Sequence, residues 1–369
     1  MLECDAIVYV LLSRERRHMA TMRNVAEYAG VSTATVSHVI NGTRYVSPEL
    51  TGRVLTAMRA LNYQPDAVAR SLRRRETLTI GLIIPSTEIP FFAAVAHSIE
   101  AAAFQAGYNV ILCNSGWNLP RELRYLGNLL ARRVDGLVCI SLEMTADQIA
   151  PVVAEGTPVV MFERRMPGIG LDAVGIDNVQ GATAAMTHLL ELRHRRIGCI
   201  RGLGTSSLSG MRLEAYRQVL AEWGVAYDPA LVCQGDYLPH SGRMAARALM
   251  DLDDPPTAIF ALNDMMAIGA LQVLHERDLR VPGDVAVVGF DGIPLTQYTS
   301  PALTTVVQPI SEMGRVAVEL LLARIRGDGP REAQFVVVEP ELVVRASTVG
   351  AAASLPAPRT ARQPTEVSS

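Results

Sequence analysis

The chain has 369 residues, of which 49% are hydrophobic and 19% are charged, and this length and composition support two or three compact units and exclude a chain without a core. The net charge of −3 is unevenly distributed. Residues 19–77 carry eight arginines against four acidic residues, residues 1–18 balance, and the remainder carries −7. A basic head on an acidic body directs the head toward phosphate and keeps the body away from it.

The amino-terminal run and the cysteines disfavour three further classes. The apolar run 6–12 follows acidic residues and precedes arginines, which is the wrong charge order for a secretory signal, and it is too short to span a bilayer. The cysteines show no CxxC pattern and no Cys/His cluster, so they indicate no metal or redox site and are expected to be reduced in a cytosolic protein. They are Cys4, Cys113, Cys139, Cys199 and Cys233.

Both ends of the chain are expected to lie outside the folded units. Residues 1–18 are expected to be a disordered or non-native extension, with the true start at Met19 or Met22. Residues 350–369 are rich in Pro, Ala, Ser and Thr and are expected to form a disordered tail.

The stretch TMRNVAEYAGVSTATVSHVING, residues 21–42, predicts two short helices, Met22–Ala29 and Thr33–Ile40. Gly30 supplies the positive φ that a tight turn between helices needs, and Ser32 is placed to cap the second helix. The outward face of that second helix carries small or hydrogen-bonding side chains and no acid: Thr33, Ala34, Thr35, Ser37 and His38. Such a row suits a helix that enters a DNA major groove, whereas the alternative is a solvated surface hairpin.

The sequence VAEYAGVSTATVSHVINGTRYVS resembles the amino-terminal helix-turn-helix of the LacI/GalR family of bacterial repressors, and through ARSL it is most similar to the purine-responsive members. The resemblance covers residues 19 to 349. It implies that side chains of the second helix, the following loop and a hinge contact DNA. The implied residues are Thr33, Ala34, Ser37, His38, Arg44, Leu72 and Arg73.

After Gly42, the pair Ser47 and Pro48 predicts the start of a third helix that ends near Leu61 and completes a helix-turn-helix domain over 19–64. The apolar residues expected to close this domain are Val54, Leu55, Met58 and Leu61. Residues 65–77 then read as a hinge helix, Ala67–Leu72, and a linker. A helix of this length is unstable alone, and the resemblance implies that it orders in the minor groove, where Leu72 wedges a base step. The alternative is a plain linker.

From residue 78 to 349, short apolar runs alternate with amphipathic segments, a rhythm that predicts parallel α/β sheets and enough strands for two of them. The strand-like runs are TIGLIIP, NVILCN, GLVCIS, PVVMFE, AVGIDN, RIGCIRG, TAIFALND and VAVVGF. The helical segments are 92–105, 122–132, 179–192, 211–223, 243–250 and 265–276. The resemblance makes this region a periplasmic-binding-protein-like core of two lobes, with a ligand cleft between them.

Nothing in the core indicates catalysis. Gly202, Gly204 and Gly210 follow a strand, but the third glycine is misplaced for a dinucleotide loop and no acid ends a later strand at the required distance. His188 and His194 lack metal partners at ligand spacing, and no GxSxG or phosphate-binding loop is present. The chain is therefore expected not to be an enzyme and to hold neither cofactor nor metal.

Polar and aromatic residues follow several of the predicted strands, where open α/β sheets bind ligands. By resemblance the effector-binding set is Phe91, Phe92, Glu163, Arg212 at the opening of its helix, Tyr237, Asn263 and Asp291. Individually these residues could be caps or turns. Purine-responsive members carry a basic residue and a threonine where this chain has Ser206 and Leu208. A sugar or sugar derivative is therefore favoured, with a purine as the alternative.

These observations predict a small all-α head on a two-lobed α/β core, working as a homodimeric transcriptional regulator, most readily a repressor. Its expected partners are a near-palindromic operator DNA and a small polar effector, with no membrane involved. The expected location is the bacterial cytoplasm, on the nucleoid when bound. A solute-binding protein is the rival from another class, but it requires export and no DNA-binding head.

Overall fold

The computed structural model describes residues 20–63, 76–141, 143–166, 168–203 and 207–350, and the chain divides into two compact units, Met1–Thr77 and Leu78–Ser369. The predictions for residues 1–18, for the hinge helix and for the tail beyond Gly350 fall outside the described residues. None of the helices in the described ranges is long and apolar enough to cross a membrane.

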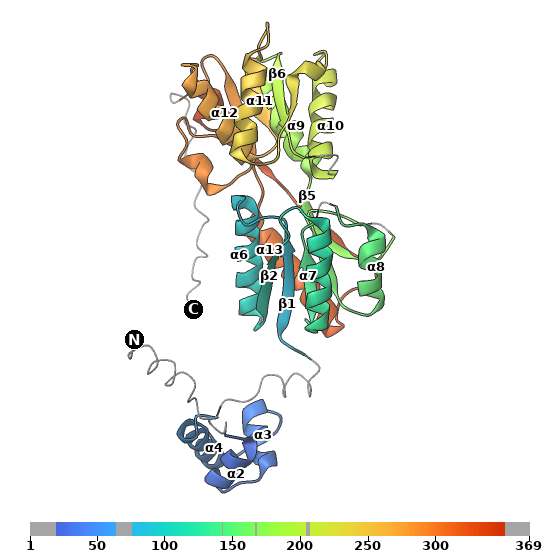
Figure 1. Cartoon of the computed structure of the whole chain (residues 1–369), viewed down its shortest axis with the longest axis vertical. Helices are drawn as coiled ribbons and strands as arrows, with labels where there is room; N and C mark the ends of the chain where they lie inside the picture. Colours follow the sequence, from blue (N-terminus) through green and yellow to red (C-terminus); the bar gives the residue numbers. More distant parts are fainter. Residues whose placement is uncertain (1–19, 64–75, 142, 167, 204–206, 351–369) are drawn as a thin grey trace, which may run out of the picture. The chain divides into compact units, whose positions relative to one another are not determined.

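The first unit contains three short helices, α2 (Met22–Ala29), α3 (Thr33–Asn41) and α4 (Pro48–Ala60), shown in blue in Figure 1. Thr21 caps α2 in a capping box with Asn24. Gly30 takes φ +62° at the turn, and the side chain of Ser32 accepts a hydrogen bond from the backbone N–H of Thr35 at the start of α3. The predicted turn and cap are both present.

Six buried side chains form the core of this unit: Val25, Ala26, Ala29, Val36, Val54 and Ala57. The prediction that Leu55 also closes the core is wrong, because Leu55 is 43% exposed. Val54, Ala57, Met58 and Leu61 lie at helical spacing on the inner face of α4, and Leu55, one residue after Val54, turns away from it.

The second unit contains two six-stranded sheets, each the centre of one lobe. Lobe 1 has the strand order β11-β5-β4-β3-β1-β2 and lobe 2 the order β12-β10-β9-β8-β6-β7. The inner parallel strands of each sheet are nearly fully buried because helices cover both faces, whereas the edge strands β2, β7 and β11 are partly exposed. The predicted α/β core of two lobes is thus confirmed.

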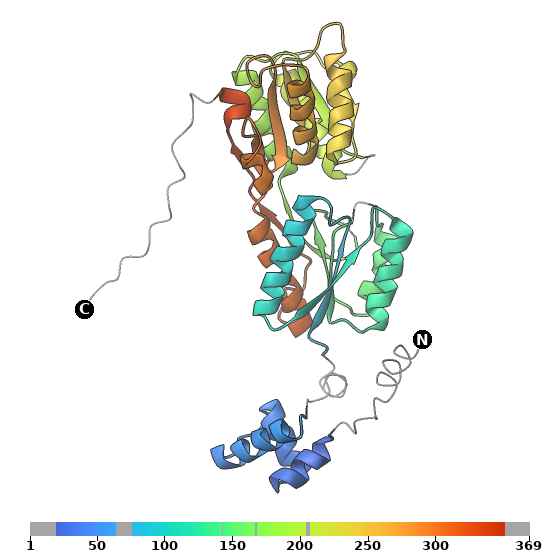
Figure 2. The same ribbon diagram turned by 60° about the vertical axis from the view of Figure 1, so that its left-hand side comes forward.

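The elements of lobe 1 are β1 (Thr79–Ile84), α6 (Pro90–Gln105), β2 (Asn109–Asn114), α7 (Leu119–Ala131), β3 (Gly136–Cys139), α8 (Ala146–Ala154), β4 (Val159–Phe162), β5 (Asp172–Ile176), α13 (Ile310–Arg326) and β11 (Phe335–Val338). Helices α6 and α13 pack together on one face of the sheet, and α7 and α8 contribute to the buried cluster on the other (Figures 1 and 2).

The elements of lobe 2 are α9 (Asn178–Glu191), β6 (Ile197–Arg201), α10 (Ser207–Glu222), η1 (Pro229–Leu231), β7 (Val232–Gln234), α11 (Pro239–Met250), β8 (Ala258–Ala261), α12 (Asp264–Glu276), β9 (Ala286–Asp291), η2 (Pro294–Gln297), β10 (Thr304–Val307), β12 (Glu341–Val343) and α14 (Ala346–Val349). Helices α9 and α10 pack together, as do α11 and α12, and the two pairs lie on opposite faces of the sheet (Figure 1).

The chain passes between the lobes three times, after β5, after β10 and after β11. As a result, β11 and α13 return to lobe 1 from late in the sequence, and β12 closes lobe 2 antiparallel to β10. These late elements, together with α8, β7, β10 and α14, are missing from the sequence predictions. β7 and β12 have only three residues each, β10 and α14 have four, and α8 contains Pro151, so these elements give weak signals. Helix α13 has 17 residues and a buried face, so its pattern was readable and was overlooked.

Candidate functional site

The outward face of α3 carries the side chains predicted to contact bases. Thr33 and Ala34 are exposed at the first turn, directly after the Ser32 cap. His38 is half-buried, and its Nδ1 lies 2.9 Å from the Thr43 hydroxyl. The amide of Asn41 donates to the carbonyl oxygen of Ser37 at 2.8 Å. The helix therefore presents two free small side chains at its start and a fixed imidazole one turn later.

Arg44 is exposed in the loop after α3, as predicted, whereas Leu72 and Arg73 lie outside the described residues. The turn before α3 is braced from α4. Arg53 donates from Nη2 to the carbonyl oxygens of Ala29, at 2.6 Å, and Gly30, at 3.1 Å. This bracing fixes the angle at which α3 leaves α2, so the exposed side chains of α3 are held as a unit.

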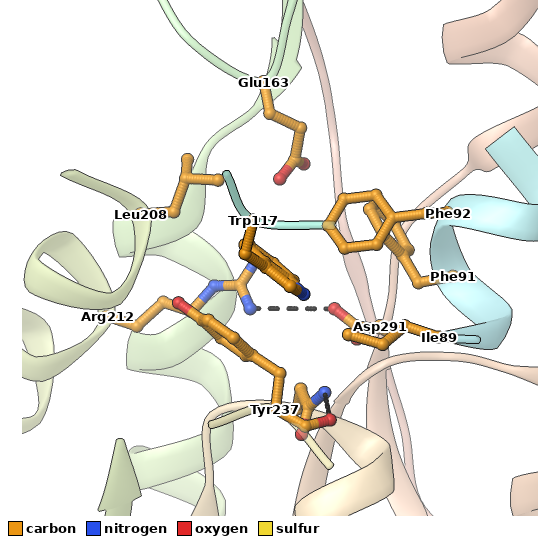
Figure 3. A pocket seen from close by; sticks show the side chains of 10 residues that line it. Ile89, Phe91, Phe92, Trp117, Glu163, Leu208, Arg212, Tyr237 and Asp291 are labelled. Atoms are coloured by element: carbon orange, nitrogen blue, oxygen red, sulfur yellow. Dashed lines mark hydrogen bonds and ion pairs between the residues drawn. The ribbon is translucent and has the colours of Figure 1, made fainter. Parts of the chain in front are cut away.

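In the second unit, ten residues line one cavity, shown from close by in Figure 3. Seven of them are the predicted effector-binding residues, which come from both lobes: Phe91, Phe92, Glu163, Arg212, Tyr237, Asn263 and Asp291. The remaining three are Ile89, Trp117 and Leu208. Their shared position follows from the topology, because parallel strands bring the residues after their carboxyl ends to one edge of each sheet.

Arg212 is the centre of the polar side of the cavity and is only 5% exposed. It lies in the second turn of α10, which begins at Ser207, so the expectation that it opens the helix is wrong. Its Nε donates to the side-chain oxygen of Asn178 and its Nη1 to the backbone oxygen of Leu262, both at 2.7 Å. Its guanidinium carbon lies 3.6 Å from the centre of the Phe290 ring. These contacts fix the guanidinium plane and leave Nη2 for a ligand.

Asp291 faces Arg212 across the cavity, with 3.6 Å between Oδ1 and Nη1 (Figure 3). The same oxygen accepts a hydrogen bond from Nε2 of Gln308 at 2.9 Å. Asp291 has φ +117°, a conformation that is rare outside glycine and is kept only where surrounding contacts over-determine it. The carboxylate is therefore positioned at a cost in backbone strain, which is typical of functional sites.

Asn263 both caps a helix and supports the cavity wall. Its side-chain oxygen accepts from the backbone N–H of Met266 in the first turn of α12, and its amide donates to the backbone oxygen of Tyr237 at 3.0 Å. Tyr237 has φ +70°, and its ring lies over Gly202, where an added Cβ would approach ring atoms to 2.0 Å. Asn263 is therefore a helix cap, which was the alternative interpretation from the sequence, and its side-chain amide also orients Tyr237.

Aromatic rings form a continuous wall from lobe 1 to lobe 2. Phe91 and Phe92 meet edge to face with centroids 5.2 Å apart, and Phe92 meets Trp117 in the same way at 5.7 Å. Trp117 then stacks on Tyr237 at 5.6 Å with an interplanar angle of 10°. Aromatic faces of this kind bind flat ring ligands and the apolar faces of sugars.

Two buried carboxyl groups of the cavity, those of Glu163 and Asp291, lie near the single guanidinium of Arg212, and a third buried acid, Asp264, lies outside the cavity lining. Burial raises the pKa of Glu163, and Arg212 partly opposes that rise. Burial also raises the pKa of Asp291 well above its usual value, in spite of Arg212, because Asp264 and Glu163 add like charge. For Asp264, burial is the main cause of a pKa of about 7. The cavity therefore carries more acidic groups than its one cation can balance.

Two family models match the chain. One, for bacterial regulatory proteins of the lacI family, covers residues 21–66, and one for a periplasmic binding protein-like domain covers residues 186–348. Among curated relatives, the HTH-type transcriptional repressor PurR of Photobacterium profundum is 38% identical over 330 residues, which cover 89% of this chain and 98% of that protein. The chain belongs to the lacI family of bacterial regulatory proteins. The PurR of Photorhabdus laumondii is 40% identical over 90% of this chain and 97% of its own length.

Solved structures of other lacI-family regulators have the same architecture. The Lac repressor dimer bound to operator and the anti-inducer ONPF matches 90% of this chain and 99% of its own, with 28% identity and a TM-score of 0.81. The complex of the transcriptional regulator CelR with cellobiose matches 89% and 99%, with 35% identity and a TM-score of 0.67. This lacI-family chain is accordingly a DNA-binding transcriptional repressor with an effector-binding core.

For this lacI-family repressor, the cavity residues that the sequence analysis did not consider are Ile89 and Trp117. A usable signal was present, because Trp117 closely follows the strand NVILCN, the same kind of position that singled out Glu163 and Asp291. Leu208 lines the cavity at the position where purine-responsive members carry a threonine, and Ser206 lies outside the described residues. That the cavity residues bind an effector stays a prediction.

Proposed function

We propose that this repressor is controlled by a purine base that binds between the two lobes of its core. The observation that carries the proposal is the ring wall from Phe92 through Trp117 to Tyr237, which faces the buried pair Arg212 and Asp291. A purine is a flat aromatic ring with hydrogen-bond donors and acceptors at its edge. It matches a site that offers stacking faces on one side and a fixed donor and acceptor on the other.

The relatives support this choice over the sugar that the sequence analysis favoured. The curated relatives named here are PurR repressors, which are purine-responsive. The case for a sugar rested on Ser206 and Leu208, which replace a basic residue and a threonine, on Asn263 and Asp291 at strand ends, and on the rings of Phe91 and Phe92. Leu208 lines the cavity, but the ring wall and the pair of Arg212 and Asp291 also suit a purine. A sugar is kept as the second candidate, because the CelR structure is a complex with cellobiose at 35% identity.

The proposal extends to the DNA side. We infer that two copies of the chain bind a near-palindromic operator, since the Lac repressor of similar architecture is a dimer on its operator. Thr33, Ala34 and His38 would then lie in the major groove of each half-site. We also propose that the cavity residues bind their ligand without changing it chemically. The protein would act in the cytoplasm, where its operator lies.

The test is calorimetry on the full-length chain with hypoxanthine, guanine, cellobiose and glucose, followed by operator binding with each ligand. The operator is selected from a randomised near-palindromic library and binding is followed by fluorescence anisotropy. At least one purine should bind and change operator affinity about tenfold or more, a coupling of typical size. If cellobiose or glucose binds and neither purine does, the sugar candidate replaces the purine.

A further inference from the structure

Thr43 lies beside the imidazole of His38 because the chain turns back on itself at the end of α3. Gly42 takes φ +61°, and its backbone N–H donates to the carbonyl oxygen of His38 at 2.9 Å. A left-handed cap of this kind brings the next residue back toward the last turn of the helix. The hydroxyl oxygen of Thr43 then lies 2.9 Å from Nδ1 of His38, although five positions separate the two residues in the sequence.

This contact occupies one of the two ring nitrogens of His38. Among the described residues of the head, the hydroxyl of Thr43 is the only hydrogen-bond partner of the imidazole. The neighbouring amide of Asn41 is used elsewhere, because it donates to the carbonyl oxygen and the hydroxyl of Ser37 at 2.8 and 3.2 Å. With Nδ1 occupied, Nε2 is the ring nitrogen that is left for a DNA base.

A threonine suits this position for two physical reasons. Its β-branched side chain has few χ1 rotamers, so holding the hydroxyl in place costs little additional entropy. The hydroxyl can also either donate to Nδ1 or accept from Nδ1–H, so Nε2 is a donor in one tautomer of His38 and an acceptor in the other. Base edges in the major groove present groups of both kinds. The base can therefore select the tautomer while the ring stays in position.

We propose that Thr43 is a positioning residue, which orients the imidazole of His38 so that Nε2 meets one base pair of each half-site. This inference rests on the proposed reading of bases by His38 and adds a residue that acts through that side chain. Without the hydroxyl, the ring would have to be ordered when DNA binds, and Nδ1 would be left unpaired at the interface. Losing one such hydrogen bond should lower the preference for that base pair between about twofold and tenfold.

The test is a double-mutant cycle of His38→Ala and Thr43→Val on the full-length chain. Valine keeps the shape of threonine and removes the hydroxyl. Binding to the selected operator and to its single-base-pair variants is followed by fluorescence anisotropy, under the ligand condition that gives the tighter operator binding. His38→Ala should identify the base pair, and Thr43→Val should weaken the preference at the same pair. The double variant should match His38→Ala, because Thr43 has no ring left to orient.

Two further variants separate this role from a structural one. Thr43→Ser keeps the hydroxyl and should recover most of the preference that Thr43→Val loses. Thr56→Val is the matched control, because Thr56 is an exposed threonine on α4. It should leave the preference at every base pair unchanged. A general loss of stability would weaken binding to all sequences and would not single out the base pair that His38 reads.

The failure of this inference can be told apart from the failure of base reading by His38. If His38→Ala lowers the preference and Thr43→Val does not, the role of Thr43 is refuted and base reading by His38 stands. Additive losses in the double variant, or an equal loss on all sequences in Thr43→Val, would show that Thr43 contacts DNA itself and would overturn the positioning role. If His38→Ala keeps every base preference, both the reading of bases by His38 and the role of Thr43 fall.

Discussion

The two lobes of the core share one strand order but bring different chemistry to the cavity. In each lobe the first strand lies second from one edge, and the strand at the opposite edge comes from late in the chain. Lobe 1 contributes apolar rings, Phe91, Phe92 and Trp117, with Glu163 as its one charged group. Lobe 2 contributes Arg212, with Asn263 and Asp291, and a network of hydrogen bonds around them.

This difference shows that topology and ligand chemistry are set separately. The fold places whatever follows a strand at the edge of the cavity. Which ligand fits depends on the side chains at those few positions. Because lobe 2 holds its polar groups by contacts within itself, it is organised before a ligand arrives, whereas lobe 1 adds surface that is removed from water when the ligand binds. The two lobes should therefore respond differently to substitution.

The largest effect is expected from the polar network of lobe 2. Arg212→Ala and Asp291→Ala each leave a buried charged partner unpaired, which costs about 3 to 5 kcal/mol and should abolish the effector response at ordinary concentrations. Operator binding without effector should stay near normal. The repressor would then be locked on DNA if the effector is an inducer, and locked off if it is a corepressor. Calorimetry and operator anisotropy measure the two properties.

Arg217→Ala is the control for Arg212→Ala, because Arg217 lies on the same helix and its side chain is 45% exposed. It should change neither property. Full-strength effector binding by both Arg212→Ala and Asp291→Ala would remove the polar network from the site and refute the division of roles between the lobes.

Much of this arrangement follows from local sequence signals. Gly30, Ser32 and the pair Ser47–Pro48 have one physical role each in a turn or cap, so the head could be predicted residue by residue. The buried parallel strands were predictable because their runs are continuously apolar. The seven cavity residues were found through family resemblance and their place after strands.

The features of the fold and the cavity that could not be predicted depend on contacts between residues far apart in the sequence. Leu55 looks like a core residue by composition, yet it lies one position from the inner face of α4. Strand β11 pairs with β5, although more than half of the core sequence lies between the two strands. No sequence pattern near Phe335 indicates that partner. The stacking of Trp117 on Tyr237 likewise joins residues of different lobes. Long-range pairing of this kind is visible only in three dimensions.

A second test of the difference between the lobes uses Asp264, a buried acid of lobe 2. Its side chain accepts hydrogen bonds from the backbone N–H of Ile293 and from the hydroxyl of Thr305. Burial raises its pKa to about 7 from 3.8. An acid with a raised pKa in the folded state stabilises the fold fully below its unfolded pKa and loses that contribution as pH rises through the folded pKa. Between pH 3.8 and 7 this one group should lower stability by up to about 1.4 kcal/mol per pH unit.

Asp264→Asn removes this titration, so the melting temperature should depend less on pH over that window than in the unmodified chain. Hydrogen exchange localises the effect, since the loss of protection with rising pH should fall in β9 and β10 and spare β1 and β3 of lobe 1. The same pH slope in the variant and the unmodified chain would show that Asp264 does not titrate in this range.

The smallest effect is expected at the aromatic wall of lobe 1. Trp117→Ala removes the ring that stacks on Tyr237, and such pairs contribute about 0.5 to 1.5 kcal/mol beyond their buried area, so effector affinity should fall between twofold and about tenfold. Trp117→Phe keeps an aromatic face and should recover most of the loss.

The chain has only two tryptophans, so in a Trp223→Phe background the fluorescence of Trp117 reports the ligand directly. Trp223 lies beside Arg195, and replacing it should leave affinity unchanged. A Trp117→Ala variant that binds as tightly as the unmodified chain would mean that the ring pair does not touch the ligand, and that the ligand is held by lobe 2 and Glu163 alone.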